Sequence, residues 1–364
     1  MIIYLFFFLL SIFSFKISCY FKGNIQRIFV FLGFFFPCFL AGVRNSNIGT
    51  DVQVYALPIF RSSQVSSMVD TIRGWQETQP IGFIAYEWLV TRLFNNFSIV
   101  LGAIELLIMI PIYRILCYFD KKNVWLGMLI YYLLFYGISL NQMKQSIAMA
   151  FVIYSLKFCL NRDILKFVFC IFVATLFHQT AFIFCFLFPL WFLFNTDFFI
   201  KKYRNLIIWS TILFSISIIF IFGDRIIVFL ASIRQTYSFM TRNIEQTSFG
   251  MIPIFILVFL FLTYYFVSKS TNNTATFNYI LCLTVVGYIL SELSLITDGL
   301  NRIAFYLQYY IILLIIFVKK MSTNNKTLKI NYIVWIIICT FIFIYNTLNN
   351  ANDIYPYSSE ILGV

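Results

Sequence analysis

Apolar and polar positions group into long blocks along this chain, with continuous apolar runs separated by short polar turns. Most runs are about 17–21 residues long, which is the length that an α-helix needs to cross the hydrocarbon core of a membrane. The pattern predicts an all-α polytopic membrane protein with about 12–13 transmembrane helices. The predicted spans cover residues 2–19, 25–43, 98–118, 123–139, 142–160, 164–177, 179–194, 205–222, 251–268, 277–297, 300–318 and 331–348.

One further apolar segment, residues 81–96, is short and carries Glu87 and Arg92. It could span the membrane, re-enter it or lie at the interface. If it does not span, and if the connection between the first two helices is cytoplasmic, most of the 26 Lys and Arg residues fall in short cytoplasmic connections. This distribution satisfies the positive-inside rule, so we prefer a topology in which this segment is a partial or re-entrant helix.

This topology makes the polar segments 44–80 and 223–250 extracytoplasmic loops of a single transmembrane domain over residues 1–364. The same face receives the C-terminal tail and the turns at 140–145, 177–179 and 297–302. We therefore expect the unusual polar residues of the chain to converge at one membrane face.

Composition supports a membrane protein and changes the meaning of the charge. Of 364 residues, 61% are hydrophobic and 11% are charged, whereas a soluble domain carries about a quarter charged residues. The net charge of +12 does not indicate nucleic-acid binding, because Lys and Arg lie in short clusters between apolar runs.

The eight Cys residues lack a CxxC motif or a nearby His, which indicates buried apolar side chains. Residues 1–19 lack a basic region and a cleavage site, so we interpret them as a spanning helix and not a signal peptide.

The first polar interruption places Arg44 and Asp51 just beyond a predicted span, with Gly49 between them and Tyr55 four residues after the Asp. An ionisable residue at such a position is costly unless it is paired or functional. The two side chains could form a local ion pair that braces the loop. Alternatively, the Arg44 guanidinium could bind phosphate oxygens, with Asp51 as a base or as the group that orients the arginine.

A second polar group lies at the start of the span that follows residue 139. The spacing of Asn141, Lys144, Gln145 and Ala148 places them on one face of a helix that begins at the outer surface. Hydrogen bonds to neighbouring helices would explain these polar residues structurally. Lys144 is the strongest functional candidate, because no cluster of basic residues lies near it.

His178 is the single histidine of the chain and lies between two predicted spans at the same face. A lone histidine is more often structural than catalytic, and it cannot anchor a metal without further ligands at suitable spacing. It is also the side chain whose ordinary pKa allows it to accept a proton near neutral pH.

Arg302 and Tyr306 are one helical turn apart on a helix predicted to begin near Leu300, and Asp298 could pair with Arg302 as a simple structural alternative. Glu105 and Glu292 are the carboxylates inside predicted spans, and two such residues are few for a carrier coupled to protons or sodium ions. Glu105 could be a hydrogen-bonded packing residue or a proton-relay site. Walker A, HExxH, GxSxG and GxGxxG motifs are absent from the sequence.

The order and spacing of these residues resemble the EpsG-like branch of the Wzy-type polysaccharide polymerases, from about residue 40 to the end of the chain. Each motif alone is weak, but their order together is fairly specific. The family usually has Arg where this chain has Lys144, and its EPGY segment is present only loosely, as Glu77, Pro80 and Gly82. The matching positions are Arg44, Gly49, Thr50, Asp51, Tyr55, Asn141, Lys144, Gln145, Ala148, Ala174, Phe177, His178, Arg302, Ile303, Tyr306, Pro356 and Tyr357.

The resemblance implies a glycosyltransferase that joins undecaprenyl-diphosphate-linked oligosaccharide repeat units at the outer face of the bacterial cytoplasmic membrane. It implies that His178 or Asp51 takes the proton of the acceptor hydroxyl, and that no metal or other cofactor is needed. Membrane lipids and a chain-length regulator are further expected partners, and nucleic acid is not. The expected ligands of the diphosphate and glycan are Arg44, Lys144, Gln145, Asn141, Arg302, Tyr306 and Tyr55.

Other functions remain open at this point. The chain could be another lipid-linked-sugar transferase or an O-antigen ligase, and Asp51, Asp70 and Glu77 would suit a transferase of single sugars. A flippase for the same lipid-linked units would place polar residues through the membrane midplane and show an internal repeat, neither of which the sequence shows. The sequence also leaves open whether the product is O-antigen, capsule or exopolysaccharide.

Overall fold

A computed structural model of the chain describes residues 1–195, 251–269, 274–293 and 298–364. Throughout these ranges the chain forms helices and turns without a β-strand, which confirms the predicted all-α fold. The predicted span 205–222 and the predicted loop 223–250 lie outside the described residues.

The helices follow the predicted apolar runs closely. In the first half of the chain they are α1 (Ile2–Ser18), α2 (Gly23–Gly42), the π-helix η1 (Val52–Ala56), α3 (Leu57–Val65), α4 (Met68–Trp75), α5 (Ile81–Phe94), α6 (Phe97–Asp120), the 3-10 helix η2 (Lys121–Asn123), α7 (Val124–Leu134), α8 (Tyr136–Asn141), α9 (Met143–Leu160) and α10 (Ile164–Phe177). The remaining helices are the 3-10 helix η3 (Gln179–Phe186), α11 (Leu187–Asn195), α13 (Met251–Ser268), α14 (Ala275–Leu293), α15 (Asp298–Gln308), α16 (Tyr310–Met321), the 3-10 helix η5 (Ser322–Asn324) and α17 (Lys326–Leu348).

Seven helices within the described ranges are long and apolar enough to cross a membrane, and three further apolar helices are shorter. Large apolar side chains remain exposed along several of them. Examples are Phe31 at 63% exposure, Phe169 at 65%, Phe261 at 69% and Ile337 at 61%. Such surfaces are rare on soluble proteins and suit contact with lipid chains. The chain is therefore a multi-pass membrane protein.

Two predicted helices are divided in the structure, and a third begins later than predicted. The predicted span 123–139 is split at Phe135, where α7 gives way to α8, and the span 300–318 is split at Tyr309, between α15 and α16. The helix predicted to carry Asn141 with Lys144 instead begins at Met143, because Gln142 has non-helical dihedral angles (φ −91°, ψ 59°). Asn141 is therefore the last residue of α8.

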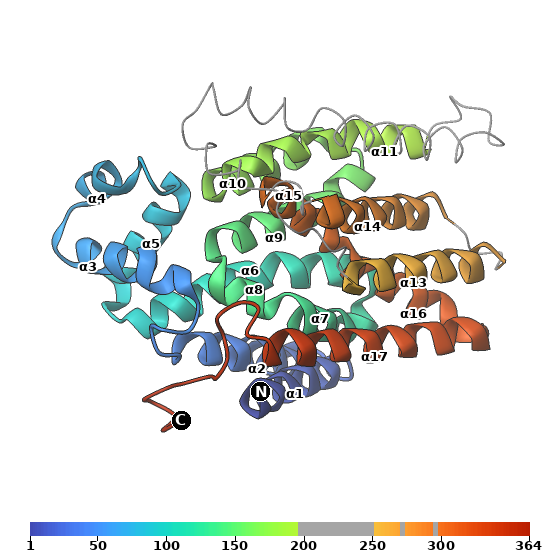
Figure 1. The fold of residues 1–364 in the computed structure, drawn as a ribbon, viewed down its shortest axis with the longest axis horizontal. Coiled ribbons are helices and arrows are strands. Elements are labelled where there is room, and N and C mark those ends of the chain that lie inside the picture. Colours follow the sequence, from blue (N-terminus) through green and yellow to red (C-terminus); the bar gives the residue numbers. More distant parts are fainter. Residues whose placement is uncertain (196–250, 270–273, 294–297) are drawn as a thin grey trace.

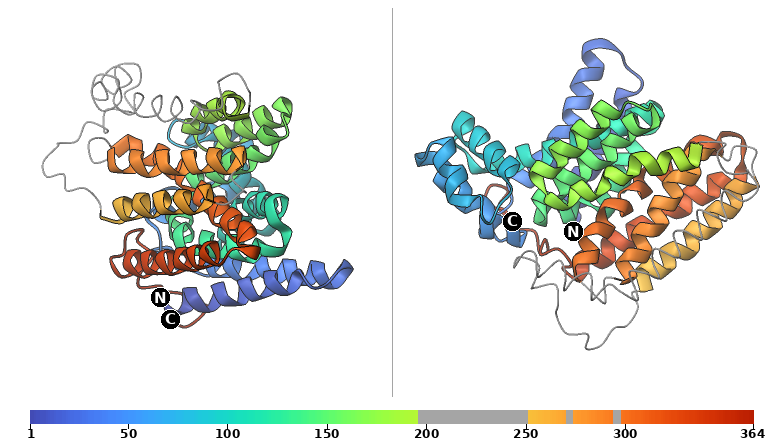
Figure 2. Two further views of the ribbon diagram at one scale, coloured as in Figure 1. Left: turned by 90° about the vertical axis from the view of Figure 1, so that its right-hand side faces the viewer. Right: turned by 90° about the horizontal axis from the view of Figure 1, so that it is seen from above.

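Helices α3, α4 and α5 form a lobe at one end of the bundle, and the C-terminal tail lies at the same end (Figure 1). The view from above shows this lobe beside the long helices and not among them (Figure 2). Helix α5 has 14 residues, fewer than the roughly 20 needed to cross the hydrocarbon core. It packs against α3, α4, α6 and α10, and Gly82 allows this because a Cβ there would lie 2.7 Å from the Leu176 carbonyl oxygen.

Basic turns from three described parts of the chain gather at the opposite end of the bundle. The Lys320 ammonium group donates to the Phe119 carbonyl at 3.2 Å, and the Cys19 thiol donates to the Lys121 carbonyl at 3.4 Å. These contacts join the turns that follow α1, α6 and α16. Three of the turns that the positive-inside rule assigns to the cytoplasm therefore lie together.

The C-terminal tail is fixed against the ends of α1 and α2. The Tyr4 hydroxyl donates to the Ile354 carbonyl at 2.9 Å, and the Tyr357 hydroxyl donates to the Leu40 carbonyl at 2.8 Å. The rings of Tyr4 and Tyr357 pack edge to face at 5.2 Å, a geometry that aromatic pairs favour. The tail thus forms part of the end of the molecule that carries the predicted polar residues.

Candidate functional site

Five predicted residues, Asp51, Tyr55, Lys144, His178 and Arg302, come together at this end of the bundle, and we call them the polar cluster. The positive charges of Lys144 and Arg302 both act on the Asp51 carboxylate and on the His178 imidazole. The five residues come from four separate segments of the chain, so the fold brings them together. Within the described residues, Asp51, Lys144 and His178 form no ion pair closer than 4.0 Å.

Lys144 stands in the first turn of α9. Its ammonium group donates to the Gln79 side-chain oxygen at 2.5 Å and lies 3.9 Å from the centre of the Tyr55 ring. The amide groups at a helix N-terminus carry partial positive charge, so a lysine there is electrostatically unfavourable for the helix itself. The lysine and the helix terminus together create a positive site suited to an anion.

Asp51 lies where the loop after α2 turns into the π-helix η1. Its peptide N–H donates to the Asn141 side-chain oxygen at 3.3 Å, and the Tyr55 hydroxyl donates to its Oδ2 at 2.6 Å. Burial raises the pKa of the Asp51 carboxyl, while the Tyr55 hydrogen bond and the positive charges of Lys144 and Arg302 act in the opposite direction. The Oδ1 atom makes no hydrogen bond within the described residues, which leaves it free to accept one.

Gly49 explains how this loop approaches the junction between α8 and α9. Its φ is +82°, in the region that favours glycine, and a Cβ at this position would lie 2.5 Å from the Leu140 carbonyl oxygen. A larger residue would therefore push the loop, and Asp51 with it, away from Asn141. Glycine is required here on both conformational and steric grounds.

His178 lies between α10 and η3 with an extended backbone. Its Nδ1 atom is 2.6 Å from the Thr180 hydroxyl and 3.2 Å from the Tyr306 hydroxyl, and Thr180 donates to Tyr306 at 3.4 Å. When Thr180 donates to Tyr306, the threonine oxygen accepts the Nδ1 proton. This tautomer leaves Nε2 with a free lone pair, as a proton acceptor requires.

The surroundings of His178 keep it neutral. Burial, Arg302 and Lys144 lower the pKa of the imidazole from 6.5 to about 4. Desolvation and neighbouring positive charges both disfavour the imidazolium form, so the two causes act in the same direction. The histidine is therefore in the correct protonation state for a base at neutral pH.

Arg302 and Tyr306 lie one turn apart on α15, and Gln145 fixes this helix to α9. The Gln145 amide donates to the Arg302 carbonyl at 2.7 Å, and the Tyr306 ring stacks on Phe184 at 4.5 Å. The Arg302 side chain is exposed at the surface of this end. The alternative pairing of Arg302 with Asp298 concerns a side chain outside the described ones.

Arg44 lies apart from the polar cluster. It is only 6% exposed, and its Nη2 atom donates to the Leu140 carbonyl at 3.0 Å. The predicted alternative of an ion pair between Arg44 and Asp51 is wrong, because the two described side chains do not pair. Arg44 instead holds the carbonyl at the junction of α8 and α9, the same junction whose other side contacts Gly49.

The charge of Arg44 faces the interior of the bundle, where it acts on Glu105 and on three tyrosine hydroxyls, those of Tyr4, Tyr136 and Tyr357. Glu105 accepts hydrogen bonds from Tyr131 at 2.7 Å and from Ser139 at 2.8 Å. This arrangement fits the first of the two alternatives for Glu105, a hydrogen-bonded packing residue.

The structure adds residues that the sequence analysis did not select. Gln79 binds Lys144 across 65 positions, so no local signal could have identified it. Thr180 follows His178 by two residues and could have been suspected from that spacing.

Glu87 is fully buried near Tyr55, and neither of its carboxyl oxygens has a hydrogen-bond partner among the described residues. Burial raises the pKa of this carboxyl well above its ordinary value.

Comparison with known proteins gives one result at the level of the family. A family model described as the EpsG family matches residues 27–359. No curated protein and no solved structure matches the chain. The matched range extends from α2 to the C-terminal tail and contains the whole polar cluster.

Proposed function

Since this chain belongs to the EpsG family, we propose that it is a glycosyltransferase that polymerises lipid-linked oligosaccharide repeat units. Membership confirms the resemblance drawn from the sequence and makes the chain a membrane protein of the polysaccharide-polymerase type. We further propose that both substrates carry an undecaprenyl diphosphate and that the reaction takes place at the outer face of the cytoplasmic membrane.

The observation that carries the proposal is the meeting of Lys144 and Arg302 with a neutral His178 at the N-terminus of α9. In the proposed reaction, an acceptor hydroxyl oxygen bonds to the anomeric carbon of the donor glycan. The bond between that carbon and the diphosphate oxygen breaks, and the lipid diphosphate leaves with the electron pair. Fixed positive groups beside the departing oxygen stabilise the charge that develops there.

Lys144 and Arg302 suit this task in different ways. The Lys144 ammonium group acts as a point charge beside the free amide groups of α9, a site that suits a phosphate. The Arg302 guanidinium can donate two parallel hydrogen bonds to phosphate oxygens. Gln145 fixes the distance between the two helices that carry these cations, because it binds the Arg302 backbone.

We assign the acceptor proton to Nε2 of His178. The imidazole is a weak base in the free protein because burial, Arg302 and Lys144 lower its pKa. A bound diphosphate offsets both positive charges, so it raises the pKa of His178 and makes the imidazole a stronger base when substrate is present. Asp51 then has a positioning role, holding Tyr55 beside Lys144.

Arg44 also receives a positioning role in this proposal, in place of the diphosphate contact expected from the sequence. Its low exposure and its bond to the Leu140 carbonyl support a function in setting the junction from which Asn141 and Lys144 project. We likewise assign positioning roles to Asn141, which binds the Asp51 backbone, and to Tyr306, which contacts His178, in place of the ligand contacts that the resemblance implied.

Cells of the source organism that lack this chain are expected to make surface polysaccharide with a single repeat unit and to accumulate the lipid-linked unit. The wild-type gene should restore a ladder of longer chains on a gel, and Arg302→Ala should not. Arg73→Ala is the matched control, because Arg73 is an exposed arginine on α4 without a described partner. Normal ladders in cells without the chain, or in cells with Arg302→Ala, would contradict the proposal.

A further inference from the structure

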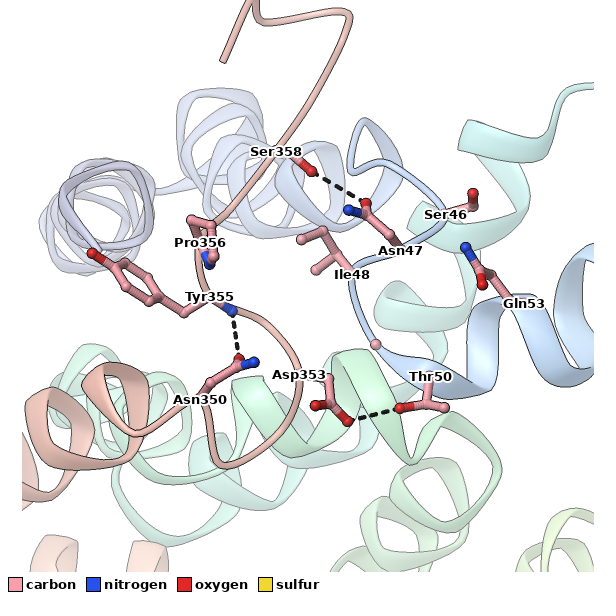
Figure 3. Close-up of a pocket in the computed structure, with 11 residues that line it drawn as sticks. Ser46, Asn47, Ile48, Thr50, Gln53, Asn350, Asp353, Tyr355, Pro356 and Ser358 are labelled. Atoms are coloured by element: carbon pink, nitrogen blue, oxygen red, sulfur yellow. Dashed lines mark hydrogen bonds between the residues drawn. The ribbon is translucent and has the colours of Figure 1, made fainter.

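A pocket of about 390 Å³ opens between the loop at residues 46–53 and the C-terminal tail at residues 350–358. We propose that this pocket binds the neutral sugar part of the lipid-linked substrate, and this inference rests on the proposed function. Figure 3 shows Asn47 and Gln53 on one wall and Asn350, Asp353 and Tyr355 on the other. The volume falls within the range of small-molecule sites, which is about 300–1,000 Å³.

Hydrogen bonds hold the two walls in place without a ligand. The Thr50 hydroxyl donates to Asp353 Oδ2 at 2.7 Å, and the Gly49 N–H donates to the Asp353 carbonyl at 2.8 Å. Across the other end of the pocket, the Ser358 hydroxyl donates to the Asn47 side-chain oxygen at 3.2 Å. The dashed contacts in Figure 3 mark two of these bonds. A site held in this way loses little entropy when it binds a ligand.

Several polar groups in these walls remain available to a ligand. The side-chain amide groups of Asn47 and Asn350 each use their oxygen, which leaves both NH₂ groups without a hydrogen bond within the described chain. Asp353 uses Oδ2 and keeps Oδ1, and the Gln53 amide makes no hydrogen bond to any residue that the structure describes. The pocket thus offers donors and acceptors together, which is what a sugar hydroxyl requires, since it both donates and accepts. The partly exposed Tyr355 ring provides an apolar surface for the C–H face of a sugar ring.

The charge of the pocket separates it from the polar cluster. Its lining contains no Lys or Arg, and its only charged residue is Asp353. Such a lining repels a diphosphate but tolerates a neutral, hydroxyl-rich ligand. The polar cluster has the opposite character and suits the diphosphate.

The two sites are adjacent through the chain itself. Gly49 and Thr50 line the pocket, and the next residue is Asp51 of the polar cluster. A substrate with its diphosphate at Lys144 and Arg302 can therefore place its sugars along this loop toward the tail. This arrangement explains why the tail, far away in sequence, is fixed so closely to residues 43–50.

The test uses the purified full-length protein in lipid nanodiscs. The probe is the free oligosaccharide released by mild acid from the lipid-linked units that accumulate in cells lacking this chain, so it has neither diphosphate nor lipid. Binding is measured by saturation-transfer difference NMR. We expect the wild type to bind the probe, and Gln53→Ala with Asn47→Ala to weaken binding by about tenfold or more.

Two controls separate this inference from the proposed function. Gln76→Ala removes an exposed amide at the end of α4, outside the pocket, and should bind the probe like the wild type. Lys144→Ala should also retain binding, although it strongly slows polymer formation. The single variant Gln53→Ala removes no hydrogen bond of the fold, so it reports on the pocket even if the double variant misfolds.

Unchanged binding in Gln53→Ala and in the folded double variant would overturn the inference, as would a wild type that polymerises lipid-linked units but does not bind the probe. Both results leave the proposed polymerase function in place. A wild type that binds the probe but never lengthens lipid-linked units would overturn the proposed function and retain the sugar site.

Discussion

Replacing Lys144 with alanine is expected to lower the rate of polymer formation by about 10²–10³-fold, the usual cost of removing one preorganised donor that stabilises developing negative charge. Lys144 is the cation in the first turn of α9, so its loss removes the charge while the helix terminus remains. The rate is measured as the appearance of products longer than one repeat unit, with the purified protein in nanodiscs. Thermal unfolding of the variant should match the wild type within a few degrees, because the contacts of Lys144 with Gln79 and Tyr55 are offset by the unfavourable position of a lysine at a helix N-terminus.

Two companion variants make the Lys144 result specific. Lys144→Arg keeps a positive charge and introduces the residue that the EpsG-like pattern usually has, so it should retain most of the rate. Lys144→Gln keeps the length and polarity of the side chain without its charge, and it should be as inactive as Lys144→Ala. A Lys144→Gln protein with a wild-type rate would show that the charge is not used.

Replacing His178 with alanine is expected to lower the rate by about 10²–10⁴-fold, the range for loss of a general base. The wild-type kcat/KM should stay level from neutral pH down to about pH 5, because His178 in the protein without substrate has a pKa of about 4. The neutral form is the active one, so activity falls only as the pH drops through that value. The measurement is a pH profile of kcat/KM for the wild type and the variant.

The charges around His178 allow a second test, the pH at which activity falls on the acid side. This pH would not change if His178 had only a structural role. Arg302→Gln removes one of the positive charges that lower the pKa of His178, so the acid limb of its residual activity should move to higher pH. Thr180→Val removes the nearer hydrogen-bond partner of Nδ1. The variant should have a lower kcat, because the imidazole proton is then no longer held on Nδ1 and can occupy Nε2, the atom that must accept the acceptor's proton. If Asp51→Asn reduces the rate more than His178→Ala does, and also removes the acid limb, the base is Asp51 and our assignment is wrong.

The all-α fold and most helix positions could be predicted from the sequence because the membrane imposes a fixed length on apolar runs. The same argument predicted that Asp51, Lys144, His178 and Arg302 share one end of the bundle, since each follows or begins a span at that end. The end of the bundle at which a residue lies follows from the order and direction of the spans, and predicting it needs no knowledge of side-chain packing.

The orientation of single side chains could not be predicted in this way. Arg44 lies only a few residues from Asp51, yet the backbone turns it inward to the Leu140 carbonyl. Topology fixes the end of the bundle at which a residue lies, whereas burial depends on packing between α2 and α8. The break at Gln142, which moves Asn141 to the preceding helix, has the same origin, because propensity gives no sign of it.

Contacts between distant segments were also beyond the sequence. Gln79 reaches Lys144 from the turn before α5, and Asp353 binds Thr50 from the opposite end of the chain. The Pro356 and Tyr357 residues of the tail fit the family pattern in the sequence. The pocket that the tail closes, however, depends on hydrogen bonds between residues about 300 positions apart in the chain. Such pairings have no periodic signal in a single sequence.

The central claim is that this chain lengthens lipid-linked glycans by means of the polar cluster. The most direct measurement gives the purified protein, in nanodiscs, the lipid-linked repeat units extracted from cells that lack it, and separates the products on a gel. The account predicts a ladder that rises by one repeat unit per step, present with Arg73→Ala and absent with Lys144→Ala. An unchanged single band with the wild-type protein, or an equal ladder with Lys144→Ala, would contradict it.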